Sequence, residues 1–181
     1  MKKFSKKLIY VSFFTIFYFF PIAQVQSLIP YYYIPTKKSL EQEGLSIGKN
    51  AYQLLYFGQY EEGLNLAKLA VKVNKTDEKL WLILSEAQVA NKLYKNALIS
   101  LNKAQKINPK NSETYILKGN IYLKNSNLQK AKTALETALR IEPKNYKAVF
   151  QLGNILLMEK NYSEAIKLFD QSVKIKPDFW P

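Results

Sequence analysis

The sequence repeats itself every 34 residues over most of its length. Alanine stands at positions 97, 131 and 165, and proline at positions 109, 143 and 177, so a stretch of fixed length recurs. Two sets of small residues keep the same step: Ala51, Ser85, Gly119 and Gly153, and Ala70, Ala104, Ala138 and Ser172. A fixed period of roughly 20 to 50 residues is the signature of a repeat array. The sequence therefore predicts stacked copies of one unit from residue 44 onward.

Each 34-residue unit holds two helical patterns with a short break between them. The units are 44–77, 78–111, 112–145 and 146–179. In the second unit, apolar residues at helical spacing run from Leu80 to Asn91 and resume from Asn96 to Ile107. Proline ends the second helix, and we expect the next helix to start behind a cap at Asp77, Ser112 or Asn145. This pattern predicts an all-α fold.

Residues 1–27 have the pattern of a secretory signal peptide or an N-terminal membrane anchor. Four lysines, the last of them Lys7, precede an apolar run that extends to Ala23. Sixteen helical residues span roughly 24 Å, less than the ~30 Å hydrocarbon core, which favours a cleaved signal. Cleavage behind Ser27 and retention of the segment both stay open. Either outcome predicts an extracytoplasmic repeat domain, and retention predicts membrane association through residues 8–25.

Residues 28–43 form a connecting segment rich in tyrosine and proline. Pro30 and Pro35 oppose a helix over the first part, so we expect extended chain there. The three tyrosines between them either pack on the first helix pair or lie at a membrane interface. Thr36 is the expected cap of the first helix.

The composition excludes several classes of function. The chain has no cysteine and no histidine, so disulfides, thiolate metal sites and the commonest general base are absent. It carries a net charge of +13 with Arg140 as its single arginine. Sequence-specific nucleic-acid sites rely on arginine, so no nucleic-acid partner is expected. We predict no catalytic residue, no metal and no cofactor.

The repeated residues resemble the tetratricopeptide repeat family. The resemblance rests on large, small and proline residues in register, namely Trp81, Ala97, Pro109, Gly119, Ala131, Pro143, Gly153, Ala165 and Pro177. The first unit fits more loosely because Lys75 stands where the other units have proline. Further departures are Asn50, Gln88 and Lys118, which replace large residues of the family pattern.

The resemblance implies an α-solenoid of helix-turn-helix repeats wound as a right-handed superhelix. In this family the first helix of each repeat lines a concave groove. Carried over to this chain, the implied peptide-binding residues are Tyr52, Leu82, Glu86, Ile116, Asn120, Lys124, Phe150, Asn154, Leu157 and Met158. Asn120 and Asn154 are 34 residues apart and could hold a peptide backbone, or bond each other or water.

The resemblance implies a non-catalytic scaffold that binds a peptide or helix of another protein, in a role such as assembly of a membrane or envelope complex. The alternative is a protein that uses the repeats to dock an envelope polymer or an enzyme. The family's carboxylate clamp is missing, because Gly48, Tyr52, Ile83 and Leu117 stand where basic residues and asparagines belong.

Residues 180–181 look like the start of a truncated further repeat. Repeat arrays usually end with a polar capping helix. Without one, apolar residues of the last helix near Phe169 and Val173 would face water. We expect either a shortened array or a homodimer through this repeat.

Ala131→Leu tests the predicted close approach of the two helices in the third repeat. The larger side chain should overpack the contact and destabilise the fold by about 1–3 kcal/mol. Thermal melts indistinguishable from those of the wild type would count against the placement.

Overall fold

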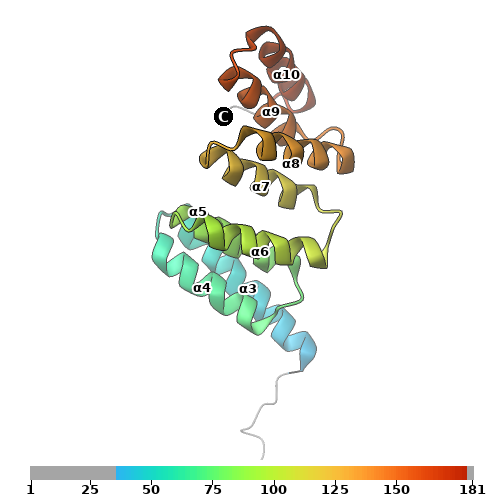
Figure 1. Cartoon of the computed structure of the whole chain (residues 1–181). Coiled ribbons are helices and arrows are strands. Elements are labelled where there is room, and N and C mark those ends of the chain that lie inside the picture. The colour runs from blue at the N-terminus through green and yellow to red at the C-terminus, as the bar shows by residue number, and fades with distance from the viewer. Residues whose placement is uncertain (1–35, 179–181) are drawn as a thin grey trace, which may run out of the picture. The chain divides into compact units, whose positions relative to one another are not determined.

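The computed structural model of the protein describes residues 36–178, which form eight α-helices and no strand. The helices are α3 (Lys37–Tyr56), α4 (Tyr60–Val73), α5 (Glu78–Ala90), α6 (Tyr94–Ile107), α7 (Ser112–Lys124), α8 (Leu128–Ile141), α9 (Tyr146–Met158) and α10 (Tyr162–Ile175). They form four antiparallel hairpins, two helices to each 34-residue unit (Figure 1). The predicted all-α repeat fold is confirmed.

The hairpins stack in chain order. The second helix of each hairpin packs on the first helix of the next, as α4 does on α5 and α8 on α9. The first helices α3, α5, α7 and α9 also contact one another in sequence, whereas in the described part of the chain no two second helices are in contact. The first helices therefore form the inner, more closely spaced side of the stack.

Small residues allow this close packing. Ala97 and Ala131 have no exposed surface, and Ala165 is 1% exposed. A Cβ added to Gly119 would lie 2.8 Å from Leu135 Cγ, and one added to Gly153 would lie 2.6 Å from the Phe169 ring. Such distances are shorter than van der Waals contact, so only glycine fits at these two positions.

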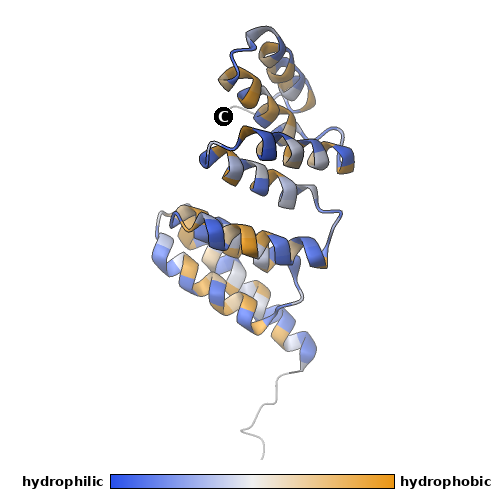
Figure 2. Ribbon diagram, in the orientation of Figure 1, coloured by the Kyte–Doolittle hydropathy of each residue, from blue (hydrophilic) through white to orange (hydrophobic). Residues whose placement is uncertain are grey.

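Three groups of buried apolar residues make up the core. The first joins the first two hairpins around Leu80 and Trp81, the second joins the last two around Leu135 and Ile155, and the third lies between them around Leu101. Figure 2 shows hydrophobic residues on every helix of the stack, with the connecting turns mostly hydrophilic.

Each hairpin turn contains one residue in the left-handed conformation, at positions 58, 92, 126 and 160. Their φ angles are +78° at Gly58, +60° at Lys92, +56° at Ser126 and +63° at Lys160. In the second hairpin, the Leu93 N–H donates to the Gln88 carbonyl at 2.7 Å and the Lys92 N–H to the Val89 carbonyl at 2.9 Å. This pair of bonds is the Schellman motif that ends helices. The same pair recurs in the other three turns.

The helix caps confirm part of the sequence prediction and correct part of it. The side chains of Asp77 and Asn145 accept backbone N–H bonds at the starts of α5 and α9, as expected. The prediction of Ser112 as a cap was wrong, because Asn111 caps α7 and the Ser112 hydroxyl donates instead to Glu142 at 2.6 Å.

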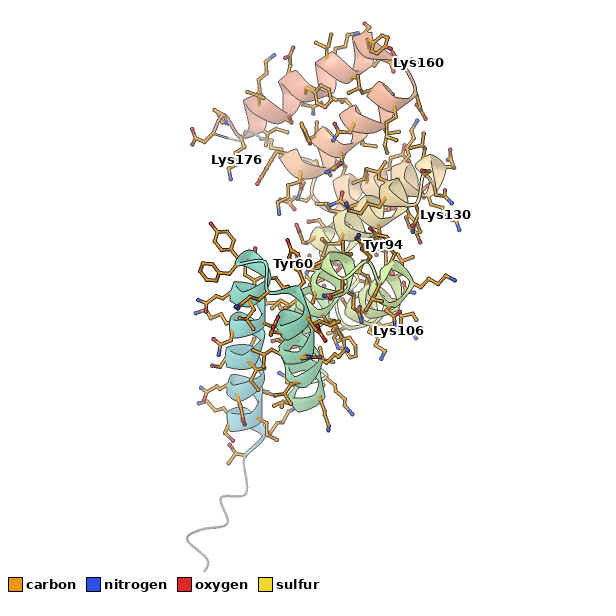
Figure 3. All side chains as sticks on the ribbon, turned by 90° about the vertical axis from the view of Figure 1, so that its left-hand side faces the viewer. Tyr60, Tyr94, Lys106, Lys130, Lys160 and Lys176 are labelled. Atoms are coloured by element: carbon orange, nitrogen blue, oxygen red, sulfur yellow. The ribbon has the colours of Figure 1, made fainter. Side chains whose placement is uncertain are left out.

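Helices α4 and α6 begin earlier than the apolar pattern suggested. Helix α6 starts at Tyr94 rather than Asn96, and α4 starts at the equivalent Tyr60 (Figure 3). Helix α3 starts directly after Thr36, where a helix start was expected.

The predicted signal or anchor segment and the tyrosine-rich stretch lie outside the described residues, as does Trp180 with its neighbours. Among the helices of residues 36–178, none combines the length and the apolar character needed to cross a membrane.

Substitutions in the turns test the left-handed conformation. Gly58→Ala should lower the free energy of unfolding by about 1 kcal/mol, because a Cβ is disfavoured at positive φ. Space is not the cause, since no atom lies within 4 Å of the added Cβ. Lys92→Gly should raise the free energy of unfolding by several tenths of a kcal/mol, because glycine adopts positive φ without a penalty.

Urea denaturation of the two variants and the wild type measures both effects. Equal stabilities for all three proteins would contradict the role assigned to these turns.

Candidate functional site

The candidate site is the first-helix face, which we define as the side chains that α3, α5, α7 and α9 direct away from the second helices. A charged contact joins two of its helices. The ammonium group of Lys147 on α9 donates to both carboxylate oxygens of Glu113 on α7, at 3.2 and 3.3 Å. These residues are 34 positions apart, so the contact joins equivalent sites of adjacent repeats. Its signal in the sequence was a pair of opposite charges one period apart.

Glu86 on α5 belongs to the same cluster. Burial and, to a smaller extent, the negative charge of Glu113 raise the pKa of the Glu86 carboxyl from 4.5 to about 7, and the positive charge of Lys147 partly offsets the rise. The side chains of three successive first helices thus share one electrostatic environment. Glu86 has no hydrogen-bonded cation of its own among the described residues, so the carboxyl exchanges a proton near neutral pH.

Asn120 stands one repeat after Glu86, at the equivalent position. Its side chain is half-buried, and its Oδ1 atom is buried with no hydrogen-bond donor among the described residues. The amide of the equivalent Asn154 donates to Gln151 Oε1 at 3.2 Å. Over residues 36–178 no hydrogen bond joins Asn120 and Asn154. The Asn120 amide oxygen is therefore an unused acceptor in the described part of the chain.

Apolar side chains lie exposed at both ends of this face. At the end of α3, Tyr52 is 53% exposed, and the rings of Tyr56 and Phe57 meet edge to face at 5.5 Å. At the end of α9, Leu157 is 46% and Met158 56% exposed. Aromatic residues and methionine are enriched at protein–protein interfaces relative to the rest of the surface. Phe57 was not predicted, because it lies in the turn beyond the first helix.

One predicted groove residue lies in the core. Ile116 is only 2% exposed and packs with Ala131 and Leu135. The family pattern assigns it to the groove, whereas the structure places it among buried residues of α8 and α9, so its contact with a partner stays a prediction.

Two other apolar residues from the predicted groove are partly buried. Leu82 packs against two of the core groups, and the Phe150 ring lies 5.3 Å from the ring of Phe169. Of the remaining predicted residues, Lys124 is exposed, while Glu86, Asn120 and Asn154 are half-buried. The accessible apolar area is consequently at the two ends rather than in the middle.

No cluster of three or more aspartates and glutamates within residues 36–178 is arranged to hold a metal ion.

A comparison with protein families matches the description "Tetratricopeptide repeat" to residues 49–112 and 116–178. The chain belongs to the tetratricopeptide repeat family. The two matched segments cover most of the described helices and follow the 34-residue period.

Solved structures share this fold at low sequence identity. TTC0263, a tetratricopeptide repeat protein of Thermus thermophilus, is 22% identical with a TM-score of 0.67, over 76% of this chain and 75% of that one. MamA from Desulfovibrio magneticus RS-1 is 19% identical with a TM-score of 0.61, over 80% and 77%. YrrB, described as having an unusual peptide-binding site, is 21% identical with a TM-score of 0.55, over 72% and 68%. No curated protein matches the sequence.

Glu86→Gln tests the electrostatic environment at the centre of the face. The folded protein holds the Glu86 proton up to about pH 7, whereas the unfolded chain releases it near 4.5. The folded state therefore binds more protons in this window, and its stability should fall as the pH rises through it. Glu86→Gln should remove this loss, so that the variant is more stable than the wild type at pH 8 and similar to it near pH 4.5.

Thermal melts between pH 4.5 and 8 provide the measurement, with Glu136→Gln on the exposed side of α8 as the control. A Glu86→Gln variant whose stability runs parallel to the wild type across this range would contradict the environment assigned to Glu86.

Proposed function

We propose that this protein is a non-catalytic scaffold whose first-helix face binds a peptide or helical segment of another protein. The single observation that carries the proposal is the arrangement of that face, in which a polar centre lies between two exposed apolar ends. A segment bound along it would contact Tyr52 at one end and Leu157 at the other, and would cross Glu86 and Asn120 between them.

The polar centre supplies specificity in this proposal. A polar group of the bound segment would hydrogen-bond the half-buried amide of Asn120, whose Oδ1 lacks a donor in the described structure. Lys147 carries one positive charge and interacts with two carboxyl groups, those of Glu86 and Glu113. A basic side chain of the bound segment would therefore pair with Glu86. Buried acceptors that gain a partner only on binding discriminate strongly among ligands.

The apolar ends would supply most of the affinity. Aromatic and aliphatic side chains dominate interface energetics, and modular contacts of this kind are often micromolar, about −8 kcal/mol. The description of YrrB as a peptide-binding member of the family supports this mode of binding.

We place the scaffold outside the cytoplasm, either secreted or held by residues 8–25, where it would assist assembly of a membrane or envelope complex. The charge and hydropathy pattern of the N-terminal segment supports this part of the proposal. The predicted homodimer through the last repeat stays a prediction, with Val173 exposed on α10.

A pair of double variants tests the binding face. Tyr52→Ser with Leu157→Ser removes both apolar ends, and Leu69→Ser with Ile99→Ser removes similarly exposed residues from the second helices. Crosslinking pull-downs from the membrane fraction should recover a partner with the wild type and the second variant, and lose it with the first.

Both variants change exposed side chains, so thermal melts should show that both remain folded. Recovery of the same partners by all three proteins would exclude the first-helix face as the binding site.

A further inference from the structure

A second feature lies on the opposite side of α7 from the first-helix face. Helices α6, α7 and α8 border an open cleft of about 290 Å³. Its walls carry two ammonium groups, two phenol groups, two amides and two threonine hydroxyls, from Gln105, Tyr115, Lys118, Tyr122, Gln129, Lys130, Thr133, Ala134 and Thr137. No carboxylate is among these lining residues. Lys118 precedes Asn120 by two positions, about 200° around a helix, so the cleft and the first-helix face are separate.

Lys118 is the residue that makes this cleft unusual. The equivalent positions of the neighbouring repeats hold leucine. Leu84 is buried, and Leu152 packs against the second core group. Lys118 is half-buried instead, and its ammonium donates to Asn102 Oδ1 at 2.7 Å and to Gln105 Oε1. Both acceptors are neutral amides, and burial lowers the pKa of the ammonium.

The two amides position Lys118 without neutralising it. Gln105 is itself fixed, because its Nε2 donates to the hydroxyl of Tyr115 at 3.1 Å, and that hydroxyl donates to the Pro109 carbonyl. An ammonium has three donors, so one remains after the two amide bonds. A half-buried charge held in place by neutral groups is stabilised when a counter-ion reaches it.

Lys130 supplies a second uncompensated charge. It lies in the first turn of α8 (Figure 3), with its ammonium 5.9 Å from the centre of the Tyr122 ring. The start of a helix already carries a partial positive charge, and no acidic residue occupies the first turn of α8. A lysine at this place is electrostatically unfavourable alone, and it becomes favourable when an anion lies beside it.

The corresponding cleft one repeat later shows that these charges are not a general property of the array. That cleft, of about 330 Å³ between α8, α9 and α10, is lined by Lys132 and Lys167 but also by Glu136 and Glu164. Its two positive charges are matched by two negative charges, and its floor is apolar, with Leu152 among the lining residues. Of these two equivalent clefts, only the one at Lys118 has lysines and no carboxylate among its lining residues.

We propose that the cleft between α6, α7 and α8 binds the oxyanion of a small soluble ligand, either a phosphate or a carboxylate group. Lys118 and Lys130 supply the opposite charge from two sides, and the Gln129 amide and the Tyr122 hydroxyl supply neutral donors. Lysines act as point charges toward such oxyanions and do not require the planar fork of arginine.

Nuclear magnetic resonance titrations of the full chain at fixed ionic strength test the proposal, with inorganic phosphate in one arm and citrate in the other. The backbone amides of Tyr122, Gln129 and Lys130 should shift in a saturable manner in at least one arm. Saturation by phosphate alone identifies a phosphate ligand, and saturation by citrate alone identifies a carboxylate ligand.

Lys118→Leu restores the residue type of Leu84 and Leu152, and it should weaken binding by about tenfold or more, the loss expected for one charge-assisted hydrogen bond. Lys130→Gln changes only an exposed side chain and should weaken binding similarly. Lys167→Leu, in the charge-matched cleft, should leave binding unchanged. The proposal fails if neither anion gives saturable shifts, if both cleft variants bind as the wild type does, or if Lys167→Leu weakens binding as much as they do.

Discussion

The close approach of neighbouring helices through small residues is the constraint on which the rest of the structure depends. Gly119 and Gly153 leave no room for a Cβ against Leu135 and Phe169, and Ala131 is completely buried. Because these positions recur every 34 residues, each hairpin has nearly the same geometry and presents the same surfaces to its neighbours. Protein interiors are packed as densely as organic crystals, so a regular spacing of small and large side chains fixes a regular stack.

That regularity separates structure from function along the chain. Buried positions repeat with small variations, while positions on the first-helix face vary more between repeats, as Tyr52, Glu86, Asn120 and Asn154 illustrate. These four residues are equivalent in the array, yet they give an aromatic end and a polar centre on one face. Lys118 is a comparable change on the other side of α7, where a charged residue replaces leucine. In repeat proteins, such departures from the pattern are the places where individual function can reside.

Most of the fold could be predicted from the sequence because its signals are local and repeated. Helix pairs, their proline ends and the caps at Asp77 and Asn145 follow from residue type and spacing. The left-handed turn at Lys92 could not, since lysine has no preference for that conformation and only the hairpin geometry imposes it. The candidate face was predicted in outline, but the burial of Ile116 could not be, because it depends on contacts with α8 and α9. The raised pKa of Glu86 also required the structure, since Glu113 and Lys147 reach it from other repeats.

The central claim is that the first helices form the closely spaced inner face of the stack. The absence of cysteine makes this directly measurable by engineered crosslinking. Glu113→Cys with Lys147→Cys places thiols on adjacent first helices, and Glu136→Cys with Asp170→Cys places them one repeat apart on second helices. A short bismaleimide should join the first pair efficiently within one molecule and the second pair poorly. Equal or preferential crosslinking of the second pair would contradict the arrangement of the helices and the binding face built on it.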